Sequence, residues 1–430
     1  MGLPKSKKPK SQGSRLSFKK KAAKEKELLS GHKQQMIKRR ELAHRVLSSV
    51  FLERKTLLES LNEHVHDQNR DWVYEVAQGA LRWFGLYSHW MDTFSEKSHV
   101  KGWVKRALSL SMYQIFWFDS VSDIQVIDET VEWIKNKKGV KVAGFANRFL
   151  RWILNRKSNQ LSQAEWLATL PEWILTALKR NYDPSFCVQF AQWAVEKPRF
   201  HAVQRPHRSW INPKDFKAVA SIEGAFEILN PDPSQCEDIQ KANGYVQDLN
   251  NQRLIKDVDQ FLLQVYGKRD FRILDLCASP GGKSIGLNWR GYSSVTATEK
   301  KEPRVERLKE NLERYAPQVE VIEWNHRSDQ GRFDGVWVDA PCSGVGTLNK
   351  LPEIRWIKDA DSLDQVQKMQ KILIDDAMSL IRPGGVLIYS VCSILHQECF
   401  DHLKSWDEQW SYFPSLDLRG EGFLAGVIKR

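Results

Sequence analysis

The feature that most constrains the fold of this 430-residue chain is a change of pattern after Lys268. From there on, short apolar runs alternate with longer amphipathic segments, which is the pattern of buried parallel strands joined by crossover helices. The expected strands cover residues 271–276, 294–298, 319–324, 335–338 and 386–390, and the expected helices cover 304–315 and 362–381. The sequence therefore predicts a doubly wound α/β domain of the Rossmann-like class, in which ligands bind beyond the carboxyl ends of the strands.

The chain before this domain shows two other patterns. Over about 41–155, apolar residues recur every three or four positions, as in Ala43, Val46, Leu47 and Val50, which predicts an all-α domain. Over about 160–270, Trp-rich helical segments precede a stretch punctuated by prolines, which predicts a small α/β linking domain. The expected division is a tail at 1–40, the helical domain at 41–160, the linking domain at 161–255 and the α/β domain at 256–430.

The first 40 residues carry the net charge of the whole chain. Of the 65 Lys and Arg and the 53 Asp and Glu residues, 14 and 2 respectively lie in this tail, which leaves 51 of each elsewhere and gives the tail the entire +12. A basic segment poor in large apolar residues cannot bury enough surface to fold by itself, so we expect disorder. Such an arm attracts nucleic acid, although a solubilising tail is the alternative.

Other features of the composition exclude whole classes of protein. The apolar runs are much shorter than the roughly 20 residues of a membrane span, and the N-terminus lacks the apolar segment of a secretory signal. We therefore expect a cytoplasmic protein with no membrane partner, and a monomer. The six cysteines form no C-x-x-C pair, which predicts reduced thiols and no metal site.

The ends of the first two expected strands indicate a ribose-bearing cofactor. The first strand runs into Asp275, Leu276, Cys277, Ala278, Ser279, Pro280, Gly281, Gly282 and Lys283. Glycines let the backbone approach a ligand closely, and the N-terminus of the following helix offers free N–H groups, although a structural turn is the alternative. The second strand ends in Glu299, whose carboxylate can accept both hydroxyls of a ribose. Beside Lys300 and Lys301, the alternative for Glu299 is a solvated acid.

Two further strand ends each deliver a cysteine. The fourth strand is followed by Asp339 and Cys342, and the fifth by Cys392. Topology brings these strand ends to one edge of the sheet, beside the cofactor loop. Carbon 5 of a pyrimidine becomes nucleophilic when a thiolate adds to carbon 6, and a carboxyl such as that of Asp339 can stabilise the charge that develops on the ring. A base must then remove the proton on carbon 5 before the thiol can leave.

Several segments of the chain together form a recognisable set. They are 277–283, 339–344 (D-A-P-C-S-G), 352–356 (P-E-I-R-W), 389–393, and, in the helical domain, 79–82 (G-A-L-R), 112–114 (M-Y-Q), 144–147 (G-F-A-N) and 149–151 (F-L-R). The catalytic set resembles the RsmB family of RNA (cytosine-5)-methyltransferases, and the helical set resembles the NusB-like RNA-binding domain. The resemblance covers nearly the whole chain after the tail.

The resemblance implies a cofactor, a substrate and residue roles. The cofactor would be S-adenosylmethionine, held by 277–283, Glu299, Asn325 and Asp339. Cys392 would be the nucleophile, Cys342 the thiol that assists proton removal and release, and Asp339 and Lys283 would complete the catalytic set. Bacterial members with this domain order modify small-subunit (16S) ribosomal RNA, which makes ribosomal RNA the expected partner. The chain departs from the family by having Ala202 for Arg, Glu299 and Asn325 for Asp, and Val391 for Thr.

Two other functions stay open at the level of sequence. In a DNA cytosine-5 methyltransferase the nucleophile is the cysteine of a Pro-Cys pair, which would be Cys342, but the second cysteine and the NusB-like domain oppose this assignment. A non-catalytic ribosome-assembly factor with a relic fold is the other alternative, and the retention of both thiols and the whole cofactor loop opposes it. The sequence does not identify the modified nucleotide.

Overall fold

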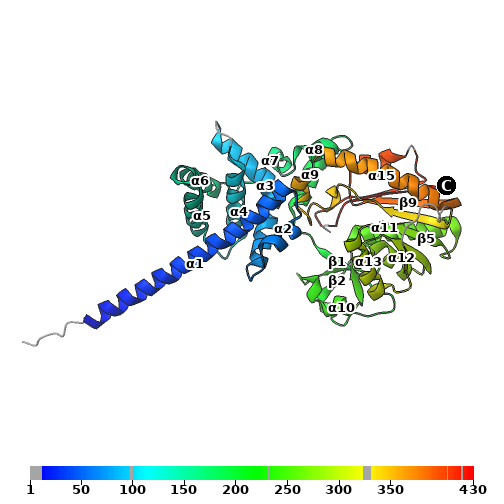
Figure 1. Cartoon of the computed structure of the whole chain (residues 1–430), viewed down its shortest axis with the longest axis horizontal. Helices are drawn as coiled ribbons and strands as arrows, with labels where there is room; N and C mark the ends of the chain where they lie inside the picture. The colour runs from blue at the N-terminus through cyan, green and yellow to red at the C-terminus, as the bar shows by residue number, and fades with distance from the viewer. Residues whose placement is uncertain (1–11, 97–99, 231, 323–330, 404, 418–419) are drawn as a thin grey trace, which may run out of the picture. The chain divides into compact units, whose positions relative to one another are not determined.

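The computed structural model describes residues 12–96, 100–230, 232–322, 331–403, 405–417 and 420–430, with the backbone alone for 12–30. The chain divides into two compact units, Met1–Gln160 and Leu161–Arg430 (Figure 1). The predicted site residues that the structure describes all lie in the second unit.

The described part of the first unit is helical throughout. Its helices are α1 (Gln12–Glu53), α2 (Leu57–His64), α3 (Arg70–Ser95), α4 (Gly102–Trp117), α5 (Asp123–Lys138) and α6 (Val140–Leu154). The apolar stripes that the sequence shows at helical spacing form the core, where Val46, Leu81, Leu108 and Phe149 are fully buried. The prediction of an all-α N-terminal domain is therefore confirmed.

The structure differs from the prediction of a disordered tail over residues 1–40. Residues 12–40 belong to helix α1, and the side chains of Met36 and Arg40 are buried in the core of the unit. Arg40 pairs with Glu129 at 2.6 Å and donates to Gln114 at 2.9 Å. The physical reason is that the segment is rich in Lys, Arg, Gln and Leu, which are good helix formers despite the charge. Residues 1–11 of the predicted tail lie outside the described residues.

The second unit begins with helices and a small sheet, in the order that the sequence predicts. The helices are α7 (Gln163–Leu167), α8 (Glu172–Leu178) and α9 (Pro184–Val195). The sheet is antiparallel with strand order β2-β3-β1-β4, formed by β1 (Phe200–Gln204), β2 (Phe216–Ala218), β3 (Ala225–Ile228) and β4 (Gly244–Val246), with α10 (Glu237–Gln240) before β4. Helices α8 and α9 pack against the loops that follow the strands of the large sheet.

The large sheet has the strand order β10-β11-β9-β8-β5-β6-β7. Its strands are β5 (Arg272–Leu276), β6 (Ser294–Thr298), β7 (Glu320–Val321), β8 (Phe333–Asp339), β9 (Ile381–Val391), β10 (Glu408–Tyr412) and β11 (Phe423–Lys429). The parallel strands β5 to β9 are those that the sequence predicts. The two strands that were not predicted, β10 and β11, extend the edge of the sheet in antiparallel pairing. The Rossmann-like fold is thus confirmed, with a mixed rather than a purely parallel sheet.

Helices cover both faces of the large sheet. On one face lie α11 (Leu249–Tyr266), α12 (Gly282–Trp289) and α13 (Glu302–Tyr315), and on the other lies α15 (Ala360–Leu380) (Figure 1). Neighbouring residues of one strand point to opposite faces, so Ile273 packs against α11 to α13 and Leu274 packs toward α15. Leu276 is paired with both Thr298 and Val338, so β5, β6 and β8 end at the same level.

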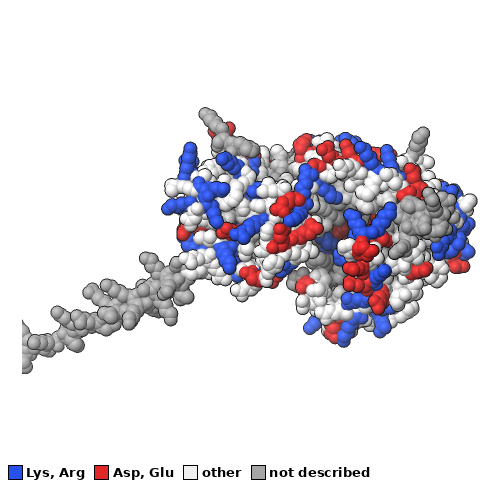
Figure 2. Space-filling model, in the orientation of Figure 1, with Lys and Arg blue, Asp and Glu red and all other residues white. Residues whose placement is uncertain are grey.

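The surface of the second unit has no single sign of charge on the face drawn in Figure 2, where Lys and Arg side chains are interspersed with Asp and Glu. This agrees with a sequence in which acidic and basic residues balance outside the first 40 positions. Within the part of the chain that the structure describes, no helix is both long enough and apolar enough to cross a membrane.

Candidate active site

The loop between β5 and α12 brings the backbone close to a cavity. Gly281, which precedes α12, has φ of +108°, and glycine adopts this conformation at little cost. The side-chain amide of Gln247 donates to the carbonyl of Gly282 at 3.1 Å. A Cβ at Gly282 would lie 2.9 Å from Nε2 of Gln247. The glycine pair is therefore required both for the turn and for the close approach of the linking segment.

Lys283 and Asp339 form an ion pair at the carboxyl edge of the sheet. Nζ of Lys283 lies 2.6 Å from Oδ2 of Asp339, and the hydroxyl of Ser390 donates to Oδ1 at 2.8 Å. The indole N–H of Trp337 in turn donates to Oγ of Ser390 at 3.0 Å, which fixes the serine. Burial disfavours the charged form of Lys283, but the charge and hydrogen bond of Asp339, together with other nearby charges such as that of Asp275, raise the pKa of the lysine above its ordinary value. The lysine is therefore a buried cation.

The two predicted cysteines are in contact. Sγ of Cys342 lies 3.0 Å from Sγ of Cys392, and both residues are half-buried. The hydrogen bond to Cys392, together with burial, raises the pKa of Cys342 well above that of an ordinary thiol. Cys342 therefore holds its proton more firmly than an ordinary thiol does, and its S–H can donate to the sulfur of Cys392.

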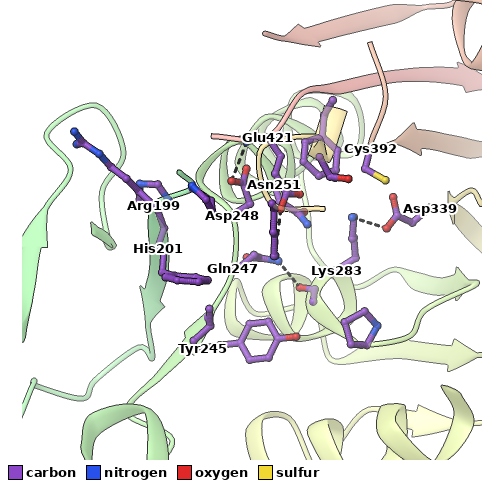
Figure 3. A pocket seen from close by; sticks show the side chains of 18 of the residues that line it. Arg199, His201, Tyr245, Gln247, Asp248, Asn251, Lys283, Asp339, Cys392 and Glu421 are labelled. Atoms are coloured by element: carbon purple, nitrogen blue, oxygen red, sulfur yellow. Dashed lines mark hydrogen bonds and ion pairs between the residues drawn. The ribbon is translucent and has the colours of Figure 1, made fainter. Parts of the chain in front are cut away.

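A cavity of about 270 Å³ opens in front of these groups. Figure 3 shows the side chains of Lys283, Asp339 and Cys392 on one side of this cavity. On the other side lie His201, from strand β1, and Arg199, which directly precedes this strand. Cys342 is not among the described residues that line the cavity. Of the two contacting thiols, Cys392 is thus the one that a molecule in the cavity would meet.

A partly buried charged cluster forms another wall of the same cavity. Nζ of Lys350 lies 3.2 Å from a carboxylate oxygen of Glu421, whose backbone N–H donates to Oδ2 of Asp248 at 3.0 Å. Burial raises the pKa of both carboxyl groups, while the charge of Lys350 opposes this rise. The cavity therefore presents both hydrogen-bond donors and hydrogen-bond acceptors, which suits a ligand that has several polar edges.

A second cavity, of about 230 Å³, lies beyond the ends of β5 and β6. Glu299 lines it, and its carboxylate is 3.1 Å from Nε of Arg304 and accepts from the backbone N–H of Lys300 at 2.9 Å. Pro341, from the loop after β8, and Ile372, from α15, contribute apolar surface. Glu299 is thus held in place at the rim of a partly apolar pocket rather than left as a free solvated acid.

The structure brings the predicted site residues together around these two cavities. The first cavity is lined by Ala278, Pro280, Gly282, Lys283, Asp339 and Cys392, and the second by Cys277 and Glu299. Ser279 and Gly281 lie in the loop between these lining residues. Asn325, the other predicted cofactor contact, lies outside the described residues. No group of His, Cys, Asp or Glu within the described ranges could hold a metal ion.

Sequence reasoning missed several residues of the site. Ser390 binds Asp339, Arg304 binds Glu299, and Asp248, Lys350 and Glu421 line the first cavity. The sequence stretch around Ser390 was already part of the motif that contains Cys392, so its position could have singled it out. The acidic residues come from segments that are distant in the chain, and no spacing pattern connects them.

Models of protein families match both units. The model described as 16S rRNA methyltransferase RsmB/F matches residues 263–407, and the NusB family model matches residues 37–155. The ribosomal RNA small subunit methyltransferase B of Photorhabdus laumondii is 26% identical over 374 residues, which cover 82% of this chain and 85% of that protein. The corresponding protein of Serratia proteamaculans is also 26% identical, over 82% of this chain and 85% of its own length.

A solved structure is similar in fold. NSun6 from Pyrococcus horikoshii, determined with SFG, superposes with a TM-score of 0.51 and 13% sequence identity, covering 60% of this chain and 98% of that one. The RsmB/F model spans the parallel strands β5 to β9 together with Cys342, Cys392 and the cofactor loop, and the NusB model spans helices α2 to α6 and the end of α1. This chain carries a methyltransferase domain of the RsmB/F family at residues 263–407 and a NusB-family domain at residues 37–155.

Proposed function

We propose that this protein transfers the methyl group of S-adenosylmethionine to carbon 5 of a cytosine in small-subunit ribosomal RNA, with Cys392 as nucleophile and Cys342 as the assisting thiol. The observation that carries the proposal is the contact of 3.0 Å between the two sulfur atoms, only one of which lines the cavity beside Lys283 and Asp339. The RsmB/F methyltransferase domain supports methyl transfer, and the names of the relatives supply the substrate class.

The residues around the second cavity fit S-adenosylmethionine. Glu299 offers an acceptor to ribose hydroxyls, and Pro341 and Ile372 offer apolar surface to a purine. The hydroxyl of Thr298 and Oδ1 of Asp275 are buried without a hydrogen-bond partner among the described residues, which leaves polar atoms available at the strand ends. When bound there, the cofactor supplies an electrophilic methyl group.

Attack by Cys392 is the first step that the geometry supports. Lys283 and Lys350 line the same cavity as Cys392, so positive charge lies near the reacting sulfur. The thiolate adds to carbon 6 of the cytosine, which forms a sulfur–carbon bond and moves an electron pair of the ring toward carbon 5. Asp339 and Lys283, paired at 2.6 Å, lie where a proton or a hydrogen bond can stabilise the charge on the ring.

Methyl transfer is followed by release, in which Cys342 takes part. Carbon 5 accepts the methyl group and then carries both this group and a proton. Once Cys392 is bonded to carbon 6, it no longer accepts a hydrogen bond as a thiolate, so the largest cause of the raised pKa of Cys342 disappears. Cys342 can then lose its own proton to solvent water and, as a thiolate, accept the proton on carbon 5, so that one proton is released overall. The electron pair re-forms the ring double bond as the bond from carbon 6 to Cys392 breaks.

The test is a methyl-transfer assay that identifies the product. Small-subunit ribosomal RNA from a strain lacking the gene is incubated with the full-length protein and methyl-labelled S-adenosylmethionine, digested to nucleosides and analysed by mass spectrometry. We expect label in 5-methylcytidine, at one position when the RNA is mapped. Label in another nucleoside, or transfer to DNA in preference to RNA, would contradict the proposal. Cofactor binding without transfer to any RNA would instead favour the assembly-factor alternative.

A further inference from the structure

We propose that Glu398 is the positioning residue of the thiol pair, because its carboxylate clamps the loop that carries Cys342 to the loop that carries Cys392. The inference rests on the proposed two-thiol mechanism and extends it to the group that sets the geometry of the pair. Glu398 lies in a short 3-10 turn, His396–Glu398, six residues after Cys392, and it is fully buried.

Three donors converge on the two oxygens of this carboxylate. The backbone N–H of Ser343 donates to Oε1 at 2.6 Å, and the hydroxyls of Ser343 and Ser393 both donate to Oε2 at 2.5 Å. Ser343 directly follows Cys342, and Ser393 directly follows Cys392. One side chain therefore binds the neighbour of each thiol, and both serines are fully buried.

The sheet does not by itself hold the thiols together. The ladder between β8 and β9 ends at the pair Asp339 and Ser390, so both cysteines lie beyond the last paired residues. Two backbone hydrogen bonds continue past the ladder, from Ala340 N–H to Ser390 O at 2.9 Å and from Gly346 N–H to Cys392 O at 3.1 Å. Neither of them holds Cys342 itself, so the position of that thiol depends on side-chain contacts of its loop.

A lysine holds the same loop from its carbonyl side. Nζ of Lys358 donates to the carbonyl oxygens of Cys342 and Ser343, at 2.8 and 2.9 Å. Burial raises the pKa of Glu398, whereas the hydrogen bonds from the two serines and the charge of Lys358 oppose this rise. As a carboxylate, Glu398 can accept all three hydrogen bonds, which a neutral side chain of the same shape cannot.

The hydrogen bonds of Glu398 to Ser343 and Ser393 should affect the release step more than the attack step. Attack on carbon 6 requires Cys392 and the cytosine, whereas release also requires Cys342 at a defined distance from the adduct. Glu398→Gln replaces one carboxylate oxygen by an NH2 group, which cannot accept a hydrogen bond. In one orientation of the amide the N–H of Ser343 loses its acceptor, and in the other the two hydroxyls lose theirs, so in both orientations the loop of Cys342 is held by fewer hydrogen bonds.

The experiment compares Glu398→Gln with the wild-type protein and with Asp334→Asn. Asp334 lies at the other end of β8, where its carboxylate also accepts a backbone N–H, that of Arg272 at 2.8 Å, so it is the matched control. For Glu398→Gln we expect kcat to fall about 10- to 100-fold, because a misplacement on the order of 1 Å can cost ~10²-fold. We expect KM for RNA and for S-adenosylmethionine to change by less than about twofold, since neither substrate is contacted.

A denaturing gel measures the covalent protein–RNA species, whose amount would not increase if Glu398 only stabilised the fold. Glu398→Gln should accumulate a covalent protein–RNA species during turnover, whereas wild type and Asp334→Asn should not. If Glu398→Gln does not fold, Ser393→Ala removes one arm of the clamp and should show the same adduct at a smaller amount. Wild-type kinetics without adduct in the folded variant, or a loss of rate that only follows the unfolded fraction, would overturn the proposal. A wild-type protein that forms no 5-methylcytidine would instead overturn the proposed function.

Discussion

Asp339 is bound from two sides, by Lys283 at 2.6 Å and by Ser390 at 2.8 Å, and it also lines the cavity. Asp339→Ala removes this carboxylate, so we expect methyl transfer to fall by about 10²-fold or more, the range associated with removal of an acid–base or charge-stabilising group. The variant should fold but unfold at a lower temperature, because the buried cation of Lys283 loses its partner. Asp364→Ala, an exposed acid on α15, is the control and should leave both quantities unchanged. Near wild-type transfer by Asp339→Ala would show that this role is misassigned.

Asp275 should make the stability of the second unit depend on pH. Burial raises the pKa of this carboxyl to about 7, although the hydroxyl of Ser284 donates to it at 2.6 Å. The folded state therefore binds the proton more tightly than the unfolded state. Its contribution to stability is complete below the unfolded pKa, near 4, and is lost as the pH rises to 7, by about 1.4 kcal/mol for each unit of difference.

Asp275→Asn removes this dependence, since an amide does not titrate. The unfolding temperature of the variant, measured relative to wild type without cofactor, should therefore rise between pH 5 and pH 8. A constant difference across this range would mean that Asp275 is ionised in the folded protein at all these pH values.

The sequence could predict most of the candidate site at this scale and failed where no local pattern exists. Cys342, Cys392 and Asp339 follow parallel strands, and the carboxyl ends of such strands meet at one edge, so their convergence follows from topology. Glu398 could not be predicted in the same way. Its partners are fixed by tertiary hydrogen bonds between two loops, and a buried glutamate has no period or spacing that distinguishes it from a surface glutamate.

At the scale of elements, the packing of α3 against α4 explains a glycine of the helical motif. A Cβ at Gly79 would lie 2.0 Å from the ring of Tyr113, whose hydroxyl donates to Glu75 at 2.6 Å. Gly79→Ala must therefore push the ring or separate the helices, and we expect a decrease of about 1–3 kcal/mol in stability. Thermal unfolding of the full chain, followed by circular dichroism, measures this effect in the helical unit.

Gly144 in α6 provides the matched control for this substitution. It belongs to the other glycine-containing motif of the same unit, but no neighbouring atom lies within 4 Å of a Cβ placed there. Gly144→Ala should therefore be neutral or stabilise by up to about 1 kcal/mol, because alanine is the better helix former. Equal effects of the two substitutions would contradict the packing described for α3 and α4.

The sequence predicted helices and strands correctly where apolar residues recur at regular spacing. It did not predict the elements at the two ends of the chain correctly. The buried strands β5, β8 and β9 and the helix α15 agree with the apolar runs in the sequence. The sequence pattern did not predict β10 and β11. They pair antiparallel at the edge of the sheet, so they are not connected by the crossover helices that indicate parallel strands in the sequence. Helix α1 begins earlier than expected, because charge alone does not prevent a segment of good helix formers from being helical.

At the scale of the whole molecule, the basic N-terminal segment should supply electrostatic affinity for RNA. Residues 1–30 hold 10 Lys or Arg and 2 Glu, while Met36 and Arg40 farther along pack into the helical unit. Deleting 1–30 should therefore weaken RNA binding and reduce the slope of log K against log salt, by roughly 0.7–0.9 for each phosphate that the segment neutralises. Titration at several salt concentrations measures the slope, and an unchanged slope would show that this segment is only a solubilising tail.

The two-thiol mechanism also implies that the reaction proceeds in two separable steps, adduct formation and adduct resolution. In the proposed mechanism the cytosine adduct forms through Cys392 and its resolution requires Cys342, whose sulfur lies 3.0 Å from that of Cys392.

The most direct test of this account is a denaturing gel of each cysteine variant with small-subunit ribosomal RNA and S-adenosylmethionine. Cys392→Ala should form no covalent protein–RNA species, because no thiol can reach carbon 6 from the cavity. Cys342→Ala should accumulate a slowly migrating covalent band, because attack proceeds and release does not. The opposite pattern, with the band formed by Cys392→Ala and not by Cys342→Ala, would reverse the roles of the two thiols. Full methylation by both variants would contradict the thiol mechanism itself.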